Sequence, residues 1–161
     1  MKRNFFNIFL LLLFTSVGCS EEEPLFTTRI HELYLNSSER VTINGTTLEL
    51  HAYLWRDFMP VSPPDGQPLR SINWLVDVDS IEVPGYIHLA EQFVIYGDSL
   101  WNAPYTEGYI MPQPYVVERM STGGPKWDPF VEVTVMAKVI DSSTGAAYLL
   151  KREKQLIHRT D

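Results

Sequence analysis

Hydrophobic and polar residues alternate with a period of two along most of the chain beyond residue 25. The clearest case lies in 130–140, where the alternate positions are Val131, Val133, Val135, Ala137 and Val139. Alternation of this kind puts one set of side chains on each face of a β-strand, and β-branched valine favours the extended backbone. Leu48, Leu50 and Leu54 predict a second strand, with Tyr53 and Trp55 on its opposite face. Ile72, Trp74 and Val76 predict a third.

Turn residues separate these runs. Asn44-Gly45 is typical of a two-residue hairpin, and prolines and glycines interrupt 60–68 and 123–129. We therefore expect about seven strands, at 27–35, 46–56, 70–79, 86–96, 113–120, 130–140 and 146–157. A short arm at 41–43 would pair with the second strand, and no long amphipathic helix is expected.

Short strands without intervening helices predict an all-β fold. The expected architecture is an immunoglobulin-like antiparallel β-sandwich of about seven strands, with Trp74 in the core between the sheets. A small up-and-down β-barrel is the alternative.

The N-terminus has a separate character. Lys2 and Arg3 precede an unbroken apolar run at 8–14, which is typical of a secretory signal peptide and too short for a membrane span. Gly18-Cys19 then resembles the lipobox of bacterial lipoproteins, although Ser16 stands where that family prefers an aliphatic residue. The resemblance implies cleavage after residue 18 and a lipid anchor on Cys19, which is the single cysteine.

Ser20, Glu21, Glu22 and Glu23 follow the cysteine and resemble the export signal of surface lipoproteins of the Bacteroidota. This resemblance implies an outer-membrane location with the domain facing the cell exterior. The expected organisation is a signal peptide at 1–18, a lipidated cysteine with an acidic tether at 19–26, and one β-sandwich domain at 27–161.

Composition narrows the function classes. The formal net charge is −7, which disfavours nucleic-acid binding because that depends on cations that neutralise phosphates. One cysteine excludes an internal disulfide and a thiolate zinc site.

Several short motifs resemble parts of known functional sites. Gly97-Asp98-Ser99-Leu100 resembles the first block of the GDSL esterases, but the later blocks that supply that family's base and acid do not occur. Asp77 and Asp79 lack the spacing of a calcium loop, and His31, His51, His88 and His158 lack chelating spacing. We expect no catalytic residue, metal or cofactor, with an esterase as a remote alternative. Asp79-Ser80-Ile81 and Asp98-Ser99-Leu100 also resemble O-glycosylation acceptors of the same phylum.

Aromatic residues are the remaining candidates for function. Trp101, Tyr105 and Tyr109 gather in one loop region, and Trp127 lies in another. Such rings either pack the ends of the sandwich or form a binding surface. The expected function is a lipid-anchored, non-catalytic module that recognises a protein partner. A polysaccharide-binding lipoprotein that uses these rings is the alternative.

Overall fold

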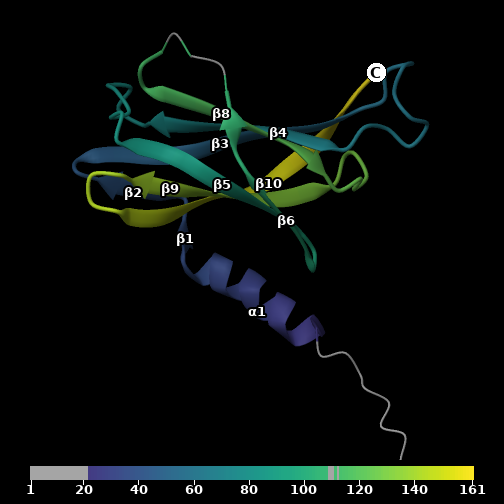
Figure 1. Ribbon diagram of the computed structural model, residues 1–161, viewed down its shortest axis with the longest axis horizontal. Coiled ribbons are helices and arrows are strands. Elements are labelled where there is room, and N and C mark those ends of the chain that lie inside the picture. The colour runs from purple at the N-terminus through teal and green to yellow at the C-terminus, as the bar shows by residue number, and fades with distance from the viewer. Residues whose placement is uncertain (1–21, 109–110, 112) are drawn as a thin grey trace, which may run out of the picture.

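The computed structural model describes residues 22–108, 111 and 113–161. Figure 1 shows the chain as a two-layered β-structure with one helix outside it. The elements are α1 (Glu22–Leu35), β1 (Ser37–Ser38), β2 (Arg40–Ile43), β3 (Thr46–Asp57), β4 (Leu69–Asp77), β5 (Ile87–Tyr96), β6 (Ser99–Pro104), β7 (Thr106–Glu107), β8 (Val116–Gly124), β9 (Glu132–Asp141) and β10 (Ala146–Thr160).

The strands form two layers. Layer A has the order β6-β5-β9-β10, and layer B has the order β3-β4-β8-β7. The chain crosses between the layers after β4, β6 and β8, which an up-and-down barrel would not do. These orders match the two sheets of an immunoglobulin-like sandwich, so the predicted fold is confirmed.

Strand β10 joins the layers. Its first part pairs antiparallel with β9, and Ile157–Thr160 pair parallel with β3. A β-bulge between Arg152 and Gln155 makes the change of layer possible, and Lys154 within it has a φ of 55°. Because β1 also pairs parallel with β10, the strand pairing is mixed and not purely antiparallel as predicted.

The core lies between the layers. Leu48, Leu50 and Leu54 of β3 face Val135 and other residues of β9 and β10 within one buried cluster. These leucines and valines are the alternating residues from which the strands were predicted. The six predicted strands from 46–56 onward all occur within a few residues of their expected bounds, whereas β6 and β7 were not predicted.

The segment 27–35 was predicted as a strand, and this prediction is wrong. It is the greater part of α1, and the backbone of the expected tether residues Glu22 and Glu23 begins the same helix. Ile30, Leu33 and Tyr34 follow helical spacing and pack against Phe93 and other residues on the outer face of layer A. Tertiary contact therefore outweighs the β-branched residues that suggested a strand.

Strand β4 has the opposite orientation to the one predicted. Ser71, Asn73 and Leu75 face the core, whereas Ile72 and Trp74 are half-buried on the outer face of layer B. Pairing with β3 sets this orientation, because neighbours in register share a face: Leu50 lies opposite Leu75 and His51 opposite Trp74. The predicted position of Trp74 in the core is therefore wrong.

Candidate functional site

The aromatic residues singled out in the sequence do not form one exposed platform. Trp101 is 8% exposed and lies in the core cluster, where its ring covers Gly124 so closely that a Cβ there would be 2.8 Å from the ring. Tyr105 also packs against this cluster, and burial raises the pKa of its hydroxyl. Trp127 is half-buried and contacts the ring of Tyr96, with centroids 5.6 Å apart. Packing is thus the arrangement found for Trp101 and Tyr105.

Tyr109, Cys19, Ser20 and Glu21 are outside the described residues. Ser99 is exposed at the start of β6, and no hydrogen bond connects it to a histidine within the described residues.

Asp77, at the end of β4, is buried, and its carboxylate accepts the backbone N–H groups of Asp79 and Ile81. The described part of the chain contains no cluster of three or more acidic, histidine or cysteine side chains that could hold a metal ion. No helix between residues 22 and 108, or after the gaps, is long and apolar enough to cross a membrane.

A group of stacked aromatic rings lies on the outer face of layer B. Tyr53 is 37% exposed, and its ring stacks on Trp55 with centroids 5.7 Å apart and on His158 with centroids 4.6 Å apart. The sequence placed Tyr53 and Trp55 on one strand face but gave them no role. His158 joins them only because the end of β10 crosses to layer B. We call the surface formed by Tyr53, Trp55, Arg70, Ile72, Trp74 and His158 the aromatic face.

Polar side chains at one end of this face are held in fixed positions. Glu49 binds the ring of His51 at 2.8 Å and the guanidinium of Arg40 at 3.1 Å. These contacts lower the pKa of the Glu49 carboxyl, with the His51 hydrogen bond as the main cause. The indole N–H of Trp74 donates to Glu118 at 2.8 Å, which fixes the orientation of that ring.

The other end of the face is bordered by two loops that a buried arginine connects. Arg56 is 3% exposed and donates to backbone carbonyls of Asp65 and Gln67 in one loop and of Lys126 and Trp127 in the other. A single side chain with several donors therefore joins 58–68 to 125–130. The loops carry exposed apolar side chains, notably Val61 and Phe130.

The inward face of β4 forms a buried polar cluster. The Oε1 of Gln92 accepts the hydroxyl of Ser71 at 2.6 Å and the Nδ2 of Asn73 at 2.8 Å. The Oδ1 of Asn73 and the Nε2 of Gln92 remain buried without a partner in the described chain. Unpaired buried polar atoms cost about 1–3 kcal/mol each, so this orientation of β4 is costly inside the core.

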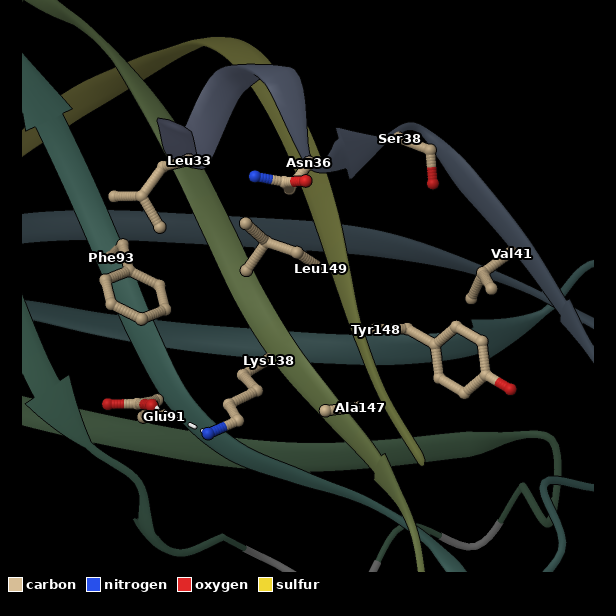
Figure 2. A pocket seen from close by; sticks show the side chains of 10 residues that line it. All are labelled: Leu33, Asn36, Ser38, Val41, Glu91, Phe93, Lys138, Ala147, Tyr148 and Leu149. Carbon is tan, nitrogen blue, oxygen red and sulfur yellow. Dashed lines mark hydrogen bonds and ion pairs between the residues drawn. The ribbon is translucent and has the colours of Figure 1, made fainter. Parts of the chain in front are cut away.

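A second candidate is the hollow beside α1 on layer A. It has a volume of about 480 Å³, which is large enough for a small molecule. Figure 2 shows Leu33 and Phe93 at one side of it and the ion pair of Glu91 and Lys138 in its wall. Lys138 lies 3.3 Å from Glu91, which also accepts Asn102 at 3.1 Å. The charged groups that line this hollow thus already have partners. The aromatic face is therefore the stronger candidate for a functional site.

No protein-family model, curated protein or solved structure matches this chain.

Proposed function

We propose that this protein is a non-catalytic binding module, held at the outer membrane by a lipid on Cys19, that recognises a protein partner through the aromatic face. The orientation of β4 is the observation that carries the proposal. This strand buries Ser71 and Asn73, leaving two buried polar atoms unpaired, and keeps Ile72 and Trp74 outside. Positions where a chain departs from the stable pattern are often those that serve function.

The position of α1 indicates which side of the molecule a lipid on Cys19 would turn towards the membrane. Figure 1 shows α1 on the side of layer A, with its N-terminal end directed away from the strands. Cys19 precedes the first residue of α1 by three positions. A lipid at Cys19 would therefore hold the side of layer A towards the membrane and leave the aromatic face on the distal side.

The arrangement of the rings favours a protein over a polysaccharide. Sugar rings bind best to aromatic faces that lie side by side and open to solvent. Here Tyr53 lies against His158 with an interplanar angle of 19°, so the rings cover part of one another. Tryptophan, tyrosine and arginine are also the residues enriched at the energetic centres of protein interfaces.

The test is cross-linking of intact cells followed by capture of this chain and identification of bound proteins. We expect one defined membrane protein to be recovered with wild type, and its recovery to fall about tenfold or more in Tyr53→Ala. Tyr96→Ala is the matched control, because Tyr96 is 40% exposed and Tyr53 is 37% exposed. Equal recovery with Tyr53→Ala would contradict the assignment of the face.

The anchor has its own test. Cys19→Ala should move the protein from the membrane fraction to the soluble fraction, because the lipid is attached through this side chain. Unchanged membrane association of that variant would refute the lipid attachment and leave the aromatic face to be judged separately.

A further inference from the structure

We propose that the partner presents a carboxylate to Arg70, so that the aromatic face recognises an acidic peptide segment with apolar neighbours. This inference rests on the proposed function and adds the chemistry of the partner to it. It is carried by the charges on the face.

Arg70 is an exposed cation within the aromatic face. It lies at the start of β4, directly opposite Trp55 in the pairing of β3 with β4. Its guanidinium makes no hydrogen bond, ion pair or ring contact with the described residues. The guanidinium of Arg70 therefore offers a planar set of free N–H donors at the strand position opposite Trp55.

Three described acids of layer B near this face have contacts of their own. Glu49 is bound to Arg40 and His51, and Glu118 is 7% exposed and accepts the indole of Trp74. Asp57, two positions beyond Trp55 on β3, accepts the backbone N–H of Met59. Arg70 is thus an exposed cation of the face without an ion pair among the described residues, although the whole chain has a net charge of −7.

Charge complementarity follows from this distribution. An arginine fork binds a carboxylate through two parallel hydrogen bonds, which are stronger and more directional than neutral ones. The half-buried Ile72 and the exposed Tyr53 next to it would contact apolar side chains on either side of that carboxylate. An acidic peptide with aromatic or aliphatic neighbours provides both groups.

The test uses the full chain in detergent and two synthetic probes, a random copolymer of glutamate and tyrosine and one of lysine and tyrosine. Binding is followed by tryptophan fluorescence and by calorimetry. We expect the acidic copolymer to bind and the basic one not to bind. Arg70→Gln should weaken binding of the acidic copolymer by about tenfold or more, and Arg70→Lys by less.

Arg152→Gln is the matched control, because Arg152 is also an exposed arginine without a contact in the described chain, but pairs in layer A. Equal binding by Arg70→Gln and wild type overturns the inference. If Tyr53→Ala then abolishes binding of both the copolymer and the cellular partner while Arg70→Gln does not, the proposed function holds but Arg70 has no part in it. If neither Arg70→Gln nor Tyr53→Ala changes binding, both this inference and the proposed function are refuted.

Polygalacturonate separates the remaining alternative. It carries carboxylates on a sugar chain without apolar side chains. If it binds in an Arg70-dependent manner and the acidic copolymer does not bind, the partner is an anionic polysaccharide and the assignment to a peptide is overturned.

Discussion

The outer faces of the two layers carry similar apolar residues but differ in what covers them. On layer A, Phe93 is 6% exposed, Ile95 4% and Met136 0%, because α1 packs over them. On layer B, Tyr53 is 37% exposed, and Trp55, Ile72 and Trp74 are half-buried. The helix of the described chain lies on layer A, and no described helix covers the aromatic face.

Apolar residues on the outer face of a sheet thus have two different roles in this protein. In layer A they form a second, smaller core that stabilises the attachment of a helix. In layer B they remain partly accessible, and the ring of Trp74 is oriented by its hydrogen bond to Glu118. Substitutions should therefore affect stability in the first face and binding in the second.

Met136→Ala should give the largest loss of stability. The side chain is fully buried, so its truncation leaves a cavity and should lower the free energy of unfolding by about 2–5 kcal/mol. Ile72→Ala on the aromatic face should cost only about 1 kcal/mol because the side chain is half-buried. Urea denaturation measures both, and similar losses in the two variants would contradict the distinction between the faces.

Replacement of both Ile30 and Leu33 by serine should detach α1 from layer A. The loss of apolar burial should cost about 2 kcal/mol and expose the patch around Phe93, which a dye that binds apolar surfaces would report. Leu35→Ser on the same helix is the control, since Leu35 is 70% exposed. An unchanged dye signal in the double variant would show that α1 does not protect this face.

Tyr34→Phe should have a smaller effect. The hydroxyl of Tyr34 donates to Oγ1 of Thr134 at 2.9 Å, and its removal should cost about 1 kcal/mol of unfolding free energy. Tyr148→Phe is the control, because Tyr148 packs against the main core and its hydroxyl makes no hydrogen bond to a described residue. Thermal denaturation of both variants measures the difference, and equal midpoints would show that this hydrogen bond does not hold the helix.

Glu49→Gln should have the smallest effect, visible in its pH dependence. The pKa of Glu49 is lowered in the folded state, so its contribution to stability is present above the unfolded pKa and is lost as the pH falls through the lower folded pKa. The amide should therefore reduce stability near neutral pH by roughly 0.5 kcal/mol, and the difference from wild type should shrink towards acid pH. Glu82→Gln, at an exposed loop position, is the control in urea denaturation at neutral and acid pH. A constant difference across the range would argue against this role.

The sequence predicted most of the β-structure because strand periodicity is a local property. Alternating valines and leucines mark β3, β9 and β10, and Asn44-Gly45 marks the hairpin from β2 to β3, since both residues adopt positive φ. The immunoglobulin-like class followed from the number and spacing of such segments.

The candidate site was predicted only in part. Tyr53 and Trp55 were placed on one face by alternation, but the same reasoning placed Trp74 in the core. Alternation identifies two faces of a strand without saying which one is buried when both carry apolar residues. Leu69 and Leu75 compete with Ile72 and Trp74 in β4, and the register with β3 decides between them.

What the sequence by itself determined is therefore the position of most strands and the class of the fold. Only the tertiary structure decided that α1 is a helix on layer A, that Trp101 closes over Gly124, and that His158 and Arg70 lie beside Tyr53 and Trp55. These are contacts between segments far apart in the chain. They depend on strand register and on the bulge in β10, neither of which any single segment encodes.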